Sequence, residues 1–293
     1  MNRSSCNSTF QKELLPSIYG VEMCVALVGN ILSLCLLVIK ERKNWNIAMA
    51  FSCNLIISNI FYALTLPLLI DYYSKGLKWD FGDAVCKIER FLFTCNLYVS
   101  IYFIMCISVI RYMAIVHPFF TSDHISLKHA KIISVFVWIS VASISSPVLY
   151  YSGFRNDRCS LFSEPGQEPK KVIFRVCMTV IGCLVPCVVT FASYFGVMVA
   201  VFKNAKINSL QKKKVSLMVV LVCTLYTVSF IPYHILQLWY FKVKEENNTN
   251  YYACNGYPVS KTLACLNMCL HPILYIAVFD NITCFRRSPD LVL

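Results

Sequence analysis

Charged residues are scarce in this sequence. Asp, Glu, Lys and Arg make up 14% of the 293 residues, whereas apolar types make up 57% and the mean hydropathy is +0.60. A soluble domain carries about a quarter charged residues, and a chain of this length cannot hide so much apolar surface in one water-soluble core. The composition therefore excludes a soluble enzyme, a disordered chain and a small disulfide scaffold. It indicates a polytopic membrane protein.

Seven long runs lack charge almost completely. Each is long enough to cross the hydrocarbon layer as a helix, and lipid forces the backbone to pair within itself. Only the first run is interrupted, by Glu22. The runs are Ser17–Ile39, Ile47–Leu69, Phe91–Ile110, Ile132–Tyr151, Val176–Phe202, Val215–Phe241 and Thr262–Phe279. We predict an all-α membrane protein, a seven-transmembrane helix bundle with a short cytoplasmic tail helix.

The basic residues are distributed unevenly between the two sides of this bundle. With the N-terminus outside, the inner side holds thirteen Lys and Arg residues and four acidic residues, a balance of +9. The outer side then holds fourteen Lys and Arg residues and eleven acidic residues, a balance of +3. The positive-inside rule favours this orientation, which also places the glycosylation sequons at Asn2, Asn7 and Asn247 outside. We expect one domain over 1–293 in the plasma membrane, with 1–16 extracellular and 280–293 cytoplasmic. No soluble basic domain is present that would bind nucleic acid.

Features of other membrane-protein classes are missing. The sequence shows no internal repeat and no membrane-embedded charges of the kind typical of transporters. No carboxylate or nucleophile constellation accompanies His234 and His271, so we predict no catalytic site. Cys265 and Cys269 lie one helical turn apart, but a structural metal needs four ligands, and packing is the favoured interpretation. We predict no metal and no cofactor.

Four cysteines fall on the outer side, namely Cys6, Cys86, Cys159 and Cys254. An even number in an oxidising compartment predicts two disulfides. The sequence alone allows three pairings of these four cysteines.

Motifs on all seven runs resemble those of rhodopsin-like G-protein-coupled receptors. They are Gly29-Asn30, Asn54-Leu55-Ile56-Ile57-Ser58-Asn59, Trp79-Asp80-Phe81-Gly82, Ile110-Arg111-Tyr112, Trp138, Pro147, Pro186, Tyr194, Phe230-Ile231-Pro232 and His271-Pro272-Ile273-Leu274-Tyr275. Within that class, Arg90-Phe91-Leu92-Phe93-Thr94, Pro232-Tyr233-His234 and Cys269-Leu270-His271-Pro272 resemble metabotropic purinoceptors, most of all the ATP-preferring subtype. Receptors for succinate and oxoglutarate are near relatives.

The resemblance implies a receptor for an extracellular anionic molecule, a nucleotide such as ATP, that signals through heterotrimeric G proteins. It selects the disulfides Cys86–Cys159 and Cys6–Cys254. Gln237 stands where purinoceptors usually place Lys or Arg. Glu89 adjoins Arg90, but its helical position predicts that it points elsewhere. The implied ligand contacts are Arg90, His234, Gln237, Tyr257 and Lys261.

The same resemblance implies an activation switch near the inner side. In the family, Arg111 reaches into the G protein when the sixth span swings outward, and prolines supply hinges. The implied switch residues are Arg111, Tyr112, Tyr194, Phe230, Pro232, Pro272 and Tyr275. Two departures stand out. Ile110 replaces the acid that usually restrains the arginine, and Asn59 replaces the aspartate that usually binds sodium beside Asn96, Ser100 and Asn267.

Two alternative functions stay open at this point. Without a cation at Gln237, Arg90 and Lys261 suffice more comfortably for a dicarboxylate than for a triphosphate, which favours a receptor for small carboxylates. The departures at Ile110, Asn59 and His271 also allow a non-signalling decoy receptor.

Overall fold

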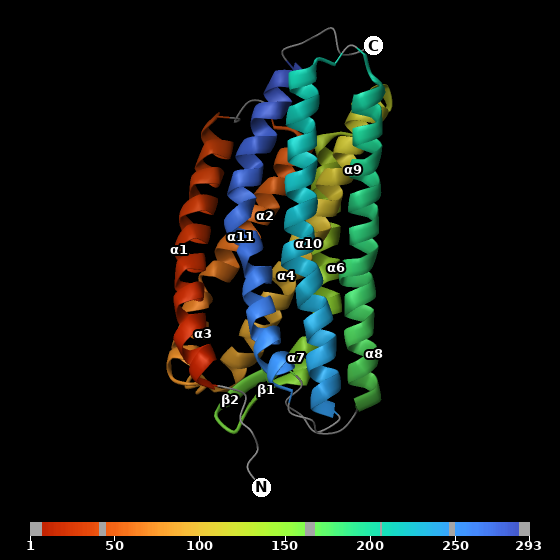
Figure 1. Cartoon of the computed structure of the whole chain (residues 1–293). Helices are drawn as coiled ribbons and strands as arrows, with labels where there is room; N and C mark the ends of the chain where they lie inside the picture. The colour runs from red at the N-terminus through yellow and green to blue at the C-terminus, as the bar shows by residue number, and fades with distance from the viewer. Residues whose placement is uncertain (1–7, 41–44, 162–167, 206, 246–249, 287–293) are drawn as a thin grey trace.

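Helices make up nearly all of the computed structural model, which describes residues 8–40, 45–161, 168–205, 207–245 and 250–286. They pack side by side as one bundle, and a short hairpin lies across the end where α1 begins (Figure 1). The elements are α1 (Ser8–Lys40), α2 (Ile47–Ala63), α3 (Leu66–Ser74), α4 (Gly82–Val116), α5 (Pro118–His124), α6 (Leu127–Ser145), α7 (Pro147–Tyr151), β1 (Ser152–Arg155), β2 (Arg158–Leu161), α8 (Glu168–Thr179), η1 (Val180–Leu184), α9 (Val185–Lys203), α10 (Ser209–Glu245) and α11 (Tyr251–Arg286).

The predicted seven-helix bundle is confirmed. Within the described residues, six helical segments are long and apolar enough to cross a membrane, and α11 is the further helix. The six are Phe10–Ile39, Ile47–Ser74, Gly82–Val116, Leu127–Tyr151, Pro169–Lys203 and Ser209–Lys244. Large apolar side chains cover the outside of the bundle; Phe136 and Phe195, for example, are 70% and 73% exposed, as lipid-facing residues are. Residues 280–286, expected in a tail helix, form the end of α11.

Prolines and one wide turn interrupt three of the spans. Pro67 and Pro147 open α3 and α7, because a proline lacks the N–H that would continue the preceding helix. The π-helical turn η1 precedes Pro186, and hydroxyl groups satisfy two carbonyls in this turn: Tyr102 donates to the Ile181 carbonyl (3.0 Å) and Tyr226 to the Cys183 carbonyl (2.9 Å). Such turns often occur at functional positions.

A chain of buried asparagines joins four helices in the middle of the bundle. The amide of Asn30 on α1 donates to the Met268 carbonyl of α11 (2.9 Å), and its oxygen accepts from Asn59 of α2 (3.2 Å). Asn96 of α4 donates to Asn59 (3.2 Å) and to Ser58 (3.0 Å). Satisfied polar networks of this kind fix helix positions inside an apolar bundle.

Candidate functional site

A β-hairpin is fixed over one end of the bundle. Strands β1 and β2 pair antiparallel, and the disulfide Cys86–Cys159 ties β2 to the start of α4. The turn is held as well: the Asp157 carbonyl accepts from the Trp79 backbone N–H (2.8 Å), and Asp83 accepts from the Phe154 N–H (2.8 Å). The predicted pairing of Cys86 with Cys159 is therefore confirmed, and the hairpin forms a rigid wall.

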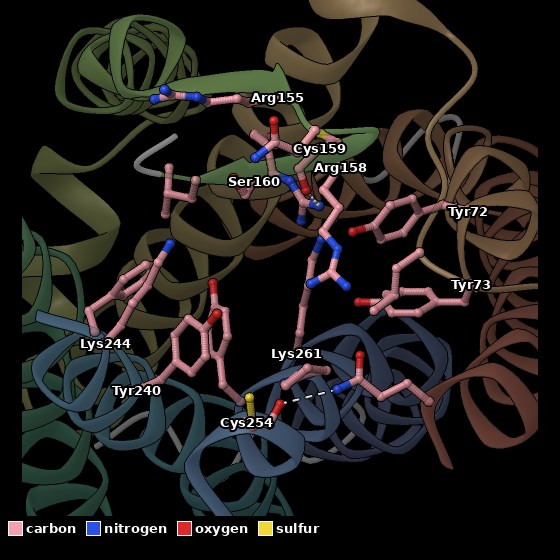
Figure 2. A pocket seen from close by; sticks show the side chains of 18 residues that line it. Tyr72, Tyr73, Arg155, Arg158, Cys159, Ser160, Tyr240, Lys244, Cys254 and Lys261 are labelled. Atoms are coloured by element: carbon pink, nitrogen blue, oxygen red, sulfur yellow. Dashed lines mark hydrogen bonds between the residues drawn. The ribbon is translucent and has the colours of Figure 1, made fainter. Parts of the chain in front are cut away.

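Beneath the hairpin lies a cavity of about 320 Å³. This volume lies at the small end of the range of ligand pockets. Five cationic side chains line it, and no Asp or Glu is among the described residues that do so. The cations come from α4 (Arg90), the hairpin (Arg155, Arg158), α10 (Lys244) and α11 (Lys261). Figure 2 shows the hairpin arginines on one side of the cavity, with Tyr240 and Lys244 across from them.

Aromatic rings form the other part of the lining. Tyr72 and Tyr73 come from α3, Tyr240 from α10 and Tyr257 from α11. The rings of Tyr240 and Tyr257 stack with their centroids 5.0 Å apart and their planes 17° apart. Flat apolar faces with hydroxyl groups at their edges suit a planar ring that carries polar substituents. The cavity therefore combines a place for anionic groups with a place for a ring.

The two deepest cations share one acid. The Glu89 side chain is fully buried, with one oxygen 3.2 Å from Lys261 Nζ and the other 3.3 Å from Arg90 Nε. The expectation that Glu89 points elsewhere is wrong, because its side chain is long enough to reach back to its neighbour and across to α11. Arg90 also donates to the Cys159 carbonyl (3.1 Å), and Lys261 Nζ lies 4.4 Å from the centre of the Phe93 ring.

Two of the predicted ligand contacts do not line this cavity. His234 is 2% exposed and packs against the rings of Tyr98 and Tyr233, with centroids 5.8 and 5.2 Å away. Gln237 is 7% exposed and donates to the Tyr233 hydroxyl (3.0 Å). Both residues lie on α10, and neither ring nitrogen of His234 has a hydrogen-bond partner among the described residues. Arg90, Tyr257 and Lys261 line the cavity. That any of the five residues contacts a ligand stays a prediction.

Arg111 lies toward the other end of the bundle, where α4 approaches α10. Its guanidinium contacts the Met218 sulfur of α10, and two of its nitrogens are buried without a hydrogen-bond partner in the described part of the chain. Ile110 and Arg111 line an apolar cavity of about 340 Å³ between α2, α4, α5 and α10. Thus α4 and α10 are in contact where the sequence predicts the switch.

The remaining predicted switch residues are distributed along several helices. Tyr112 on α4 faces α9, where a side chain at Gly196 would overlap its ring. Tyr194 and Phe230 are buried, Pro232 lies inside α10, and Pro272 lies against Gly29 of α1. The side chain of Tyr275 lies outside the described residues.

Comparison with known proteins gives one consistent family. Residues 29–275 match the model of the 7 transmembrane receptor (rhodopsin family). Purinoceptor 1 of Cavia porcellus is 34% identical over 289 residues, covering 95% of this chain and 76% of its own. Purinoceptor 11 of Homo sapiens is 31% identical over 310 residues, which cover 96% of this chain and 83% of the relative. The chain belongs to the rhodopsin family of receptors and is of the metabotropic purinoceptor type.

The receptor is thus a multi-pass membrane protein of a receptor class, and not a member of an enzyme family. Its resemblance to purinoceptors, inferred from the motifs, is confirmed. The subtype stays a prediction, because relatives of two differently numbered subtypes match with similar identity.

Several lining residues of the receptor were missed by the sequence interpretation. Arg155 and Arg158 could have been predicted from the sequence, because they flank a two-residue turn just before Cys159, in the loop that the disulfide holds over the bundle. No sequence pattern distinguishes Lys244, Tyr72 and Tyr73, because span ends commonly carry such residues at the membrane interface.

Some predictions fall on residues that the structure does not describe. These are the sequons at Asn2, Asn7 and Asn247, and Cys6 as the partner of Cys254. Cys254 itself is disulfide-bonded and lines the cavity. Its pairing with Cys6 stays a prediction.

Proposed function

We propose that this receptor lies in the plasma membrane with its N-terminus outside, binds an extracellular nucleotide such as ATP, and activates heterotrimeric G proteins. The observation that carries the proposal is the cavity under the hairpin, which combines five cations with four tyrosines. Anionic groups gain charge-assisted hydrogen bonds from Arg and Lys, and a base gains stacking partners. The relatives named purinoceptors support the same ligand class.

The orientation has independent support. The disulfide and the hairpin lie at the end of the bundle opposite Arg111, and disulfides form on the extracellular side. We therefore assign 1–16 to the outside and 280–293 to the cytoplasm, within one receptor domain over 1–293. The charge count between the spans gives the same answer.

A receptor for small dicarboxylates is the second candidate. Two observations favour it: α10 places the uncharged Gln237 outside the cavity lining where purinoceptors usually carry a cation, and Glu89 neutralises part of the charge of Arg90 and Lys261. The cavity volume of about 320 Å³ also suits a small ligand. A comparison of agonists on matched variants separates the two candidates.

The test measures calcium and cyclic-AMP responses of transfected cells to ATP, ADP, UTP, UDP, succinate and 2-oxoglutarate. We expect a nucleotide response whose potency falls roughly 10- to 150-fold in Arg90→Gln and in Arg158→Gln, because each loses a charge-assisted hydrogen bond of about 1.5–3 kcal/mol. Lys87→Gln is the matched control, since Lys87 lies on the same helix as Arg90 but pairs with Asp83 outside the cavity.

Each outcome of this assay has a clear meaning. A carboxylate response that is lost in the same variants would replace the nucleotide by the second candidate. Silence with all six compounds, in cells where surface expression is verified, would contradict the proposal and favour a decoy. An equal loss in Lys87→Gln would show that the effects of Arg90→Gln and Arg158→Gln are not specific to the cavity lining.

A further inference from the structure

Glu89 stands in an unexpected position for a receptor of anions. Its side chain is fully buried, and it contacts both deep cations of the cavity, Lys261 at 3.2 Å and Arg90 at 3.3 Å. An acid at this position competes with any ligand anion for Arg90 and Lys261. A packing role alone would not require a charge, because an apolar residue fills a buried position at lower desolvation cost.

Charge is consequently divided unequally along the cavity. The inner end holds Arg90 and Lys261 with Glu89 between them, which leaves one net positive charge. At the outer end, Arg155 and Arg158 line the cavity, and neither forms an ion pair with an acid of the described residues. Among those residues, the outer end therefore holds two positive charges that no acid is paired with.

We propose that Glu89 is a specificity-determining residue, a built-in counter-anion that limits the negative charge accepted by the inner end and directs the most highly charged group of the ligand to Arg155 and Arg158. This inference rests on the proposed function, because it assumes an anionic ligand in the cavity. The ligand class it names is an elongated anion: one weakly charged group lies inside, and a polyphosphate-like group lies under the hairpin.

The physical reason is repulsion between like charges at short range. A ligand oxygen bound to Arg90 and Lys261 lies within a few ångströms of the Glu89 carboxylate, where water is excluded and charges are weakly screened. Each further charge on that ligand group adds to the repulsion. Under the hairpin, where the Arg155 and Arg158 side chains extend in different directions (Figure 2), the same group meets a guanidinium group, which binds phosphate oxygens in a two-pronged geometry.

The test uses the purified full-length receptor in nanodiscs of uncharged lipid. Inorganic phosphate, pyrophosphate and tripolyphosphate serve as a charge series, and affinity is measured from ligand-induced thermal stabilisation at constant ionic strength. The quantity that matters is the ratio of tripolyphosphate affinity to phosphate affinity. A purely structural role of Glu89 would change stability but leave that ratio unchanged.

We expect Glu89→Gln to raise this ratio by about tenfold or more, because the inner end then offers two uncompensated cations. The double variant Glu89→Gln with Lys261→Gln restores one net charge there, so its ratio is expected to return close to the wild-type value. Asp80→Asn is the matched control, since Asp80 is an exposed acid paired with Lys75 outside the cavity, and its ratio is expected to stay unchanged.

Arg158→Gln tests the other half of the inference. We expect it to lower tripolyphosphate affinity about tenfold or more in the wild-type background and by a smaller factor in Glu89→Gln, where the inner end competes for the charged group. If Glu89→Gln does not reach a folded state, Glu89→Met removes the same charge with a side chain of similar length and is expected to raise the ratio in the same direction.

Several results would overturn the inference. An unchanged or lowered ratio in Glu89→Gln would do so, and so would the absence of binding of all three phosphates to both wild type and Glu89→Gln. Failure of the proposed function is distinguishable. If the receptor signals to nucleotides but the ratio does not change in Glu89→Gln, only the inference about Glu89 is refuted. If the ratio changes but the receptor is silent to nucleotides, only the proposal of a nucleotide agonist is refuted.

Discussion

Replacement of Tyr226 by Phe is expected to raise basal signalling. The Tyr226 hydroxyl on α10 donates to the Cys183 carbonyl in the π-helical turn η1, at 2.9 Å, and the side chain is fully buried. In rhodopsin-like receptors the sixth span, here α10, swings outward on activation. We therefore expect the bond between α10 and η1 to belong to the resting arrangement, together with the contact between Arg111 and Met218. Because Ile110 cannot pair with Arg111, we expect this bond to act as a further restraint on α10.

The magnitude follows from the single bond removed. A buried hydrogen bond contributes about 0.5–1.5 kcal/mol net, and Phe keeps the ring and its edge contact with Phe230. If that energy is lost from the closed state alone, the ratio of active to resting receptor rises roughly two- to thirteenfold. A receptor with about 1% active population would then reach about 2–11%.

The assay is ligand-free G-protein activation, measured as nucleotide exchange in membranes and normalised to surface expression. Tyr102→Phe is the matched control: Tyr102 also donates to a carbonyl of the π-helical turn, that of Ile181 (3.0 Å), but it lies on α4 and not on α10. Basal activity that is unchanged in Tyr226→Phe, or raised equally in both variants, would show that this bond does not restrain α10.

Two further predictions concern the departures from the usual family residues. Asn59 carries no formal charge beside Asn30 and Asn96, so agonist affinity is expected to be insensitive to sodium at constant ionic strength, whereas Asn59→Asp is expected to create sodium sensitivity. A several-fold sodium effect in the wild type that disappears in Asn59→Ala would contradict this. Ile110→Asp supplies an acid next to Arg111 and is expected to lower basal signalling about tenfold, which is the effect of one charge-assisted hydrogen bond. Unchanged activity in the ligand-free exchange assay would show that the residue at position 110 does not determine basal signalling.

Some features of the site could be predicted because they depend on local order in the chain. The positions of Arg90 and Lys261 follow from motifs at fixed offsets along single spans. The pairing of Cys86 with Cys159 comes from the resemblance to the receptor family, because the sequence alone allows three pairings. His234 and Gln237 could not be placed in the same way. A helix has several faces, and a small rotation of α10 decides whether a side chain meets the cavity or its neighbours Tyr98 and Tyr233.

The number of spans can be read from residue order alone, and the charge of the loops predicts their direction. Lipid requires long uncharged helices, and basic loops favour the inner side, so neither inference depends on which helices touch. The arrangement of charge around the cavity depends instead on how the helices pack. Glu89 reaches Lys261 across 172 residues of chain, and the hairpin carries Arg155 and Arg158 over the same space. Such contacts arise from the rotation and approach of whole helices, which no local pattern specifies.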